Sequence, residues 1–501
     1  MRDLPVYPLP DTATLLVSGG DARITLDPVS GLSMYGCRPC PDPELIAFGS
    51  STASLISPAG FAAADALRQT LRMQLRDQSA AAVYALHAER LRSDLLEQCG
   101  VSRVDGVAGV DVVLAASGTD VHLLAAQWLR PQRTVSVTKS ETGSGVPAAL
   151  QGQHFNTLAA GGGAVMTGTP VADWTGALFT VAARAPDGTL RDEAAVDADT
   201  IAHVAHAVEA GQRVLLILTD VSKTGLIVPR IETVLYLKNR WPAHVTVLVA
   251  ACQFRLSAAT VRAYLAQDCL VALTGSKFIS GPTFCGALLI PPSIAARYRD
   301  QTLAIGVGAY STVADWPAGW RASRLLPYAA NFGLLLRWEA ALTELRPFFA
   351  LPASLITTFL QRFSIAVQAR LAHDACFETL TAPALCRPLP GMLKSWDTLQ
   401  TIFSFLIYQR DKQGGRRPLS HVETVGLYQR LRSGADSTQD RFQFGQPVPC
   451  GDRNGVAVSA LRLCVSAPMI VAACKNIDDA NAIIAHALAA LNRITHDQSA
   501  R

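Results

Sequence analysis

The sequence has little charge, no marked excess of either sign and no long apolar run. Only 17% of its 501 residues are charged, below the roughly 25% usual for soluble proteins. The 44 basic and 40 acidic residues leave a net charge of +4 and form no basic cluster, which argues against nucleic-acid binding. The longest apolar runs, Val245 to Cys252 and Cys269 to Leu273, are far shorter than the about 18 residues of a membrane span. We therefore expect neither nucleic acid nor a membrane as a partner.

The cysteines show no pairing pattern. Their number, 11, is odd and their spacing irregular, and a chain of this size needs no disulfides to fold. The N-terminus, Met1 to Pro5, has no basic stretch followed by an apolar one, as a secretion signal would. Both features favour a cytoplasmic protein. Cys37 and Cys40 form a C-x-x-C, but no second pair follows at zinc-finger spacing, so we expect a loop there and no metal.

The middle of the chain alternates short β-branched runs with stretches of helical length. Several of the runs are apolar throughout, as strands buried on both faces of a parallel sheet are. The pattern predicts an α/β fold with a large domain built on a mostly parallel, seven-stranded sheet. The predicted strands are Val110 to Ala115, Thr134 to Thr138, Leu178 to Ala183, Val214 to Leu218, Val245 to Ala250, Cys269 to Leu273 and Ala287 to Ile290.

The flanking regions are mainly helical. Two long helices are expected before the sheet, Phe61 to Leu75 and Ala80 to Leu96, the second with Leu86, Leu91, Leu95 and Leu96 on one apolar stripe. After Pro292 the pattern predicts a smaller α+β domain. Its expected helices are Gly333 to Leu345, Leu355 to Leu371 and Ala480 to Ile494, its strands Thr401 to Leu406 and Val456 to Val465, and its loops Gly414 to Pro418 and Ser433 to Arg441. We predict an N-terminal segment over residues 1–57, a large domain over 58–320 and a small C-terminal domain over 321–501.

A candidate anion site lies where the first predicted strand meets a helix. Ser117, Gly118 and Thr119 would begin that helix, whose free N–H groups and positive dipole end attract a phosphate. The same residues also make a good helix cap without any ligand, and the two interpretations are equally well supported by this motif alone.

Three further polar motifs follow predicted strands. Lys277 comes just after the run Cys269 to Leu273, preceded by Thr274 and Ser276, and a lysine at such a strand end can form a Schiff base. By itself this motif is better explained as a surface lysine in a loop. Ala250 to Gln253 and Asp220 to Gly225 end two other strands. Because carboxyl ends of parallel strands meet at one edge of a sheet, we expect all these residues to converge.

Taken together, these motifs resemble those of the class V aminotransferase group of fold-type I pyridoxal phosphate enzymes, which includes cysteine desulfurases and kynureninases. The resemblance covers roughly residues 45 to 470. It implies that Lys277 holds the cofactor covalently and later moves protons, and that Gln253 hydrogen-bonds the cofactor's phenolic oxygen with Ser222 beside it. It also implies that Arg462 clamps the substrate's α-carboxylate. The phosphate contacts would come from Ser117, Gly118, Thr119, Thr274 and Ser276.

Ala250 departs from the family pattern. Relatives carry an aspartate there that faces the pyridine nitrogen and keeps it protonated, and an alanine cannot do this. The cofactor then works with a neutral ring, or the activity is weakened, or the chain is an engineered variant. No residue could be assigned to stack on the cofactor ring, since Glu141 to Gly145 offers no aromatic group and His154 is the first candidate after it.

The resemblance implies an enzyme that acts on an α-amino acid, as a lyase of the desulfurase type or as a transaminase. A desulfurase needs a nucleophilic cysteine, for which Cys450 is the best placed candidate, although a structural cysteine in a loop explains it better. The family further implies a homodimer in which a loop such as Ala309 to Thr312 reaches the neighbouring site. The alternative is a catalytically impaired protein of the same fold with a binding or regulatory role, which Ala250 favours and Lys277 opposes.

Overall fold

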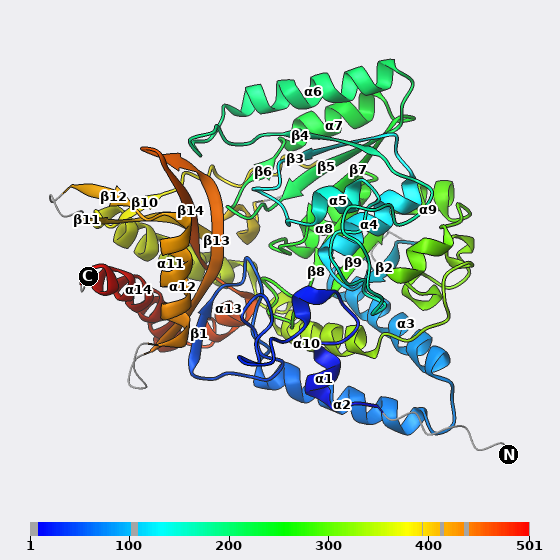
Figure 1. Ribbon diagram of the computed structural model, residues 1–501, viewed down its shortest axis with the longest axis horizontal. Helices are drawn as coiled ribbons and strands as arrows, with labels where there is room; N and C mark the ends of the chain where they lie inside the picture. The colour runs from blue at the N-terminus through cyan, green and yellow to red at the C-terminus, as the bar shows by residue number, and fades with distance from the viewer. Residues whose placement is uncertain (1–8, 102–108, 393, 411–414, 435–439, 500–501) are drawn as a thin grey trace.

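The computed structural model describes residues 9–101, 109–392, 394–410, 415–434 and 440–499, and shows two sheets with helices packed around each (Figure 1). The larger sheet has eight strands, in the order β2-β9-β8-β7-β5-β3-β4 with β6 beside β5. Its strands are β2 (Asp111–Ala115), β3 (Arg133–Val137), β4 (Ala177–Val181), β5 (Val214–Asp220), β6 (Ile227–Val228), β7 (Val245–Ala251), β8 (Leu270–Thr274) and β9 (Gly286–Ile290).

All seven predicted strands of this sheet are present, and the two-residue β6 is an addition. The strands β4, β3, β5, β7 and β8 are parallel, whereas β9 runs antiparallel to both β8 and β2. The prediction of an α/β fold with a mostly parallel sheet is therefore confirmed.

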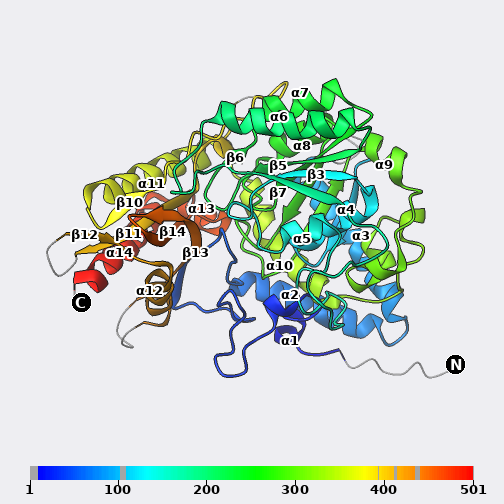
Figure 2. The ribbon, with the colours of Figure 1, turned by 45° about the horizontal axis from the view of Figure 1, so that its top comes forward.

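The larger sheet is covered on both faces, which explains its continuous apolar runs. Alternate residues of one strand enter opposite cores: Leu248 and Ala250 pack with α4 (Gly118–Leu129), and Val247 and Val249 pack on the other side. Figure 2 shows the helices of that second side, α6 (Glu193–Glu209), α7 (Ile231–Arg240) and α8 (Ala258–Ala266), above the strands, with α4 and α5 (Val146–Leu150) below.

The two predicted helices before the sheet are α2 (Pro58–Gln74) and α3 (Ala80–Gln98), and both pack against α10 (Phe332–Phe349). Each begins at a serine cap, Ser57 or Ser79, whose side chain accepts a backbone N–H of the first turn. The predicted stripe on α3 is wrong in one member, because Leu86 is 54% exposed while Leu91 and Leu95 are buried. Leu86 lies five residues before Leu91, about 140° away around the helix, and so falls on the exposed face.

The second sheet contains β1 (Leu45–Phe48), β13 (Arg441–Arg453), β14 (Val456–Cys464), β11 (Ile402–Arg410) and β10 (Phe377–Thr379) in that order, with β12 (Arg416–Pro418) beside β11. It is antiparallel except between β1 and β13. Helices α11 (Ala353–His373) and α14 (Ile477–Ser499), both predicted, complete this α+β part of the chain with α12 (His421–Ser433) and α13 (Ala467–Ala473), which were not predicted.

Two loop predictions need correction. Arg416 to Pro418 is the strand β12, and Arg441, the end of the second predicted loop, begins β13. Residue 414 and residues 435–439 lie outside the described residues.

Strand β1 comes from the predicted N-terminal segment yet pairs with β13 in the second sheet. The domain boundaries at residues 57 and 320 stay a prediction.

Within the described ranges, no single helix has both the length and the apolar composition to cross a membrane. The pair α10 and α11 would meet those limits together, but the chain bends by 97° between them. The same ranges contain no group of three or more His, Cys, Asp or Glu side chains that could hold a metal ion.

Candidate active site

A cavity of about 220 Å³ opens where the carboxyl ends of β5, β7 and β8 meet the start of α4. Residues of β13 and β14 from the second sheet line its other wall, and the N-terminal segment contributes Arg23, Tyr35, Ser51 and Thr52. Nine of the ten predicted site residues line this cavity: Ser117, Gly118, Thr119, Ala250, Gln253, Thr274, Ser276, Lys277 and Arg462.

The start of α4 is built directly on the end of β2. Ser117 is the cap residue, and its Oγ accepts the backbone N–H groups of Thr119 and Asp120 at 3.2 and 3.3 Å. A Cβ at Gly118 would lie 2.9 Å from the Sγ of Cys252 and 3.0 Å from the Cγ2 of Thr274. Only glycine therefore lets this helix start approach the ends of β7 and β8 so closely. The start of α4, with the positive end of the helix dipole, therefore lies on the cavity wall.

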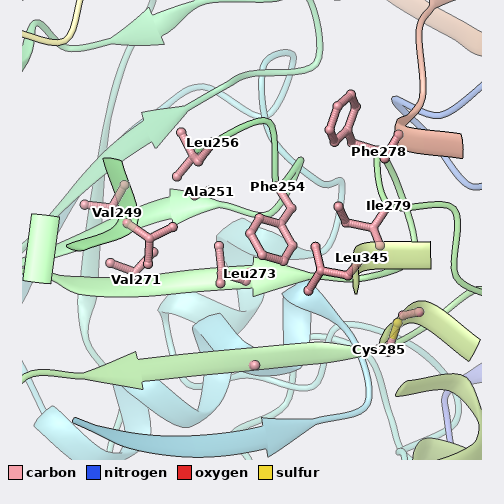
Figure 3. Packing of buried hydrophobic residues seen from close by; sticks show 14 of the residues in the cluster. Val249, Ala251, Phe254, Leu256, Val271, Leu273, Phe278, Ile279, Cys285 and Leu345 are labelled. Carbon is pink, nitrogen blue, oxygen red and sulfur yellow. The ribbon is translucent and has the colours of Figure 1, made fainter. Parts of the chain in front are cut away.

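Lys277 follows β8 on a turn that is fixed by the core. Its carbonyl accepts the hydroxyl of Ser54 at 2.7 Å and the N–H of Ser280 at 2.9 Å. The next two residues, Phe278 and Ile279, are buried in the same apolar cluster as Leu273 and Leu345 (Figure 3). The backbone of Lys277 is thereby held while its amine faces the cavity.

The pKa of the Lys277 amine lies below the ordinary lysine value. Burial is the main cause, and the positive charges of Arg462, Arg255 and Arg23 add to it, while the Cys252 thiol acts in the opposite direction. Burial also lowers the pKa of Lys223, the other lysine of the lining, to about 8. A lowered pKa increases the fraction of neutral amine, which is the form that attacks a carbonyl group.

Gln253 and Ala250 lie at the end of β7. The Nε2 of Gln253 donates to the Ser51 carbonyl at 3.0 Å, and its Oε1 is buried without a partner. Ala250 stands opposite Thr219 of β5 in the strand register, and the Thr219 hydroxyl is likewise buried, unpartnered and on the cavity wall. A neutral hydroxyl is thus the polar group next to the position where the family pattern has a carboxylate.

Ser222 is the predicted residue that does not line the cavity. It is buried behind the wall, where its hydroxyl donates to Glu141 Oε2 at 2.7 Å. Glu141 also accepts the Thr224 hydroxyl and forms an ion pair with Arg184 at 2.9 Å. Among the described lining residues Glu141 is the only carboxylate, and these bonds commit it to holding the turn after β5. The sequence analysis names Glu141 only as the first residue of the segment Glu141 to Gly145, which has no ring-stacking group.

Arg462 comes from β14 and faces the cavity from the second sheet. Its Nη2 donates to Thr52 Oγ1 at 2.8 Å and to the Gln446 carbonyl at 2.6 Å, while its Nε is buried without a partner. No described carboxylate pairs with this arginine, although it is only 2% exposed. A buried guanidinium without a counter-charge is an incomplete site that an anionic ligand can complete.

Two other sequence-based candidates lie away from the cavity. Cys450 is in strand β13 rather than in a loop, buried in a small apolar cluster, and burial raises the pKa of its thiol to about 11. Such a thiol is poorly ionised and does not line the cavity. Tyr310, Ser311 and Thr312 are buried against their own chain, and Tyr310 hydrogen-bonds His154 at 2.8 Å. This loop therefore offers no support for a dimer, and the homodimer stays a prediction.

The sequence did not identify Arg23, Tyr35 or His122 as cavity residues. Arg23 and Tyr35 lie in the N-terminal segment, remote in sequence from every other site residue, and no motif marks them. His122 lies one turn after Gly118 on α4, with its Nδ1 at 2.6 Å from the Gly118 carbonyl, and burial lowers its pKa to about 4. In the sequence, the one signal for His122 is its position four residues after Gly118 in the predicted helix, which puts both residues on the same face.

Comparisons with known proteins agree on the fold. No family model matches the chain, and no curated protein matches it in sequence. The chain is similar to a cysteine desulfurase from Thermococcus onnurineus NA1, with a TM-score of 0.54 and 13% identity over 88% of this chain and 94% of that one. It is also similar to the cystine C-S lyase C-DES in complex with cysteine persulfide, with a TM-score of 0.52 and 16% identity over 87% and 97% of the two chains. The predicted resemblance is thus confirmed for the architecture: this chain has the type I fold of pyridoxal phosphate enzymes that cysteine desulfurases share.

Proposed function

We propose that this protein is a pyridoxal phosphate-dependent enzyme that acts on an α-amino acid. The observation that carries the proposal is the meeting of three groups in one cavity: a helix start suited to a phosphate, the amine of Lys277 and the unpaired guanidinium of Arg462. Buried polar atoms without partners line the same space, namely Ser51 Oγ, Thr219 Oγ1, Gln253 Oε1, Thr283 Oγ1 and Arg462 Nε. A polar ligand would supply the partners they lack.

The cavity residues fit this cofactor at each of its ends. Ser117, Gly118 and Thr119 would hold the phosphate with Thr274 and Ser276, and Gln253 would contact the phenolic oxygen. Ala250 would lie against the ring edge beside Thr219. Arg462, on the opposite wall, would bind the α-carboxylate of the amino acid through its planar fork of N–H donors.

When bound, the cofactor supplies a carbonyl carbon for covalent attachment and a ring that accepts electron density from the substrate Cα. The neutral amine of Lys277 would hold the cofactor at that carbon. When free, the same amine would serve as the base that removes the Cα proton of the amino acid and as the acid that returns it at Cα or elsewhere. The buried side chains of Phe278 and Ile279 anchor the backbone of the turn that carries this amine.

The reaction that follows is a lyase reaction of the desulfurase type or a transamination. Cys450 lies outside the cavity with a raised thiol pKa, which argues against it as the nucleophile of a desulfurase. The cysteine of the lining is Cys252, and burial raises the pKa of its thiol to about 11 as well. A catalytically impaired protein is the less favoured alternative, because Lys277, Gln253 and Arg462 all remain on one cavity.

Borohydride reduction tests the proposal. The protein is incubated with pyridoxal phosphate, reduced, digested and analysed by mass spectrometry, and we expect the pyridoxyl group on the peptide that contains Lys277. Lys223→Ala is the matched control, since it removes the other lysine of the lining. Label on many surface lysines with none on Lys277 would contradict the proposal.

A further inference from the structure

The N-terminal segment sends one buried arginine to the start of α4. Arg23 lies in a short 3₁₀ helix, Ala22–Ile24, and is 9% exposed. Its Nη1 donates to Thr119 Oγ1 at 3.2 Å and its Nη2 to Ser117 Oγ at 3.3 Å. The guanidinium thus contacts two of the three residues that form the anion site, although it lies nearly one hundred positions before them in the chain.

The guanidinium is held by Asp21 and Phe284, and its other donors meet only hydroxyl oxygens. Asp21 accepts from Nε at 2.9 Å and from Nη2 at 2.5 Å, and the ring of Phe284 lies 4.6 Å below the guanidinium carbon. An arginine has five N–H donors, and those that Asp21 does not bind, on Nη1 and Nη2, meet the hydroxyl oxygens of Thr119 and Ser117, with Tyr35 as a further neighbour. Their present contacts to hydroxyl oxygens are long, and phosphate oxygens make shorter and stronger bonds with a guanidinium.

Charge balance at this end of the cavity requires a cation. Asp120, next to Thr119 on α4, is buried, and burial together with the charge of Asp21 raises its pKa to about 7. A phosphate placed here adds further negative charge beside two carboxyl groups. The remaining lining cations have other surroundings: Arg462 bonds Thr52 and Gln446, Lys223 reaches the Lys139 carbonyl, and Lys277 attaches the cofactor in the proposed function.

We propose that Arg23 is the cation that binds the cofactor's phosphate, so that the N-terminal segment completes the cofactor site. This inference rests on the proposed function. It assigns the segment a ligand-binding role that no motif of the sequence indicates. It also predicts that Arg23 contributes to the binding of pyridoxal phosphate but not to that of pyridoxal, which has no phosphate.

The test compares the affinities of the two aldehydes by absorbance titration. For the unmodified protein we expect pyridoxal phosphate to bind far more tightly than pyridoxal. In Arg23→Gln, the affinity for pyridoxal phosphate should fall by about 10- to 100-fold, the usual effect of losing a charged hydrogen bond, while that for pyridoxal changes by less than about twofold. Inorganic phosphate should compete with pyridoxal phosphate in the unmodified protein and much less in the variant.

Two controls separate phosphate binding from a structural role. Asp21→Asn combined with Arg23→Gln leaves no unpaired buried carboxylate at position 21, and should show the same selective loss. Arg441→Met removes another ion pair of the N-terminal segment, to Asp42 at 2.6 Å, and should change neither affinity.

The outcomes are distinguishable. Equal losses for both aldehydes, or an unchanged preference for the phosphorylated one, would overturn the role of Arg23 and leave the proposed function standing. If neither aldehyde binds the unmodified protein, the proposed function itself fails.

Discussion

The two walls of the cavity are built in different ways. On the large-sheet wall, Ser117, Gln253 and Lys277 each come directly after a buried strand, so the sheet register fixes where they lie. On the opposite wall, Arg462 lies within β14, opposite Gly445 of β13, and its Nη2 donates to Thr52 from the N-terminal segment and to Gln446 of β13. In the proposed function the first wall holds the cofactor and the second recognises the amino acid.

This contrast makes the two functions separable by mutation. Changes on the large-sheet wall should alter cofactor attachment or the chemistry at Cα. Changes on the second wall should alter amino acid binding and leave attachment intact.

The largest effect is expected for Lys277→Ala. Because the covalent bond needs this amine, the variant should lose the borohydride-reducible label completely and lose all turnover, as shown by mass spectrometry and by activity with amino acids. If the variant still carried the pyridoxyl label on another lysine of the cavity, such as Lys223, that lysine would be the residue that holds the cofactor.

The pH dependence of attachment sharpens the same assignment. The pKa of Lys277 is lowered, so its neutral and reactive form is present at a lower pH than for an ordinary lysine of pKa about 10.4. The rate of attachment, followed by absorbance, should rise with pH and level off below that value. A rate that continues to rise through pH 10 would show that the reacting amine is not perturbed.

Phe278→Ala should destabilise the protein by about 3–5 kcal/mol, because it leaves a cavity in the core beside Trp396, on which Phe278 stacks at 5.7 Å. It should also weaken cofactor attachment by loosening the turn that carries Lys277. Urea unfolding and labelling yield measure the two effects. Phe363→Ala is the matched control: an equally buried phenylalanine of α11, whose loss should cost similar stability but spare the label.

Arg462→Gln should weaken amino acid binding by about 1.5–3 kcal/mol, or roughly 10- to 150-fold, since a charge-assisted pair with the α-carboxylate is lost. The affinity for pyridoxal phosphate should stay within about twofold. Titration of the cofactor-loaded protein with amino acids, followed by absorbance, measures amino acid binding. The yield of the borohydride-reduced label measures the binding of pyridoxal phosphate. Equal losses of amino acid binding and of pyridoxal phosphate binding would mean that Arg462 stabilises the fold and does not bind the substrate.

The smallest effect is expected for Ala250→Asp. A carboxylate next to Thr219 would favour protonation of the ring nitrogen, and one pKa unit of coupling corresponds to about 1.4 kcal/mol, or about tenfold in rate. Exchange of the substrate Cα hydrogen with deuterated solvent should accelerate by that factor, whereas Ala250→Asn, similar in shape but uncharged, should show little change. Equal rates in all three folded, loaded proteins would mean that residue 250 does not face the ring.

Much of the large sheet could be predicted because its strands are buried on both faces and leave uninterrupted apolar runs. The second sheet was harder. Strand β13 contains Pro447 and Pro449 and shifts register on either side of them, and a proline in a sequence argues against a strand. The structure tolerates both because β1 pairs only with residues 441–444, so that no strand of the described residues pairs with the far half of β13 on that side.

The sequence by itself determined the strand-end motifs of the large sheet, and with them Lys277 and the start of α4, because a residue that follows a parallel strand is placed by local chain geometry. The tertiary structure alone decided that Arg23 reaches Ser117 and Thr119, that Ser222 turns away from the cavity to Glu141, and that Cys450 is packed into a core. These contacts join segments far apart in the chain. Their geometry depends on how the N-terminal segment and the second sheet pack against the first, which no local pattern records.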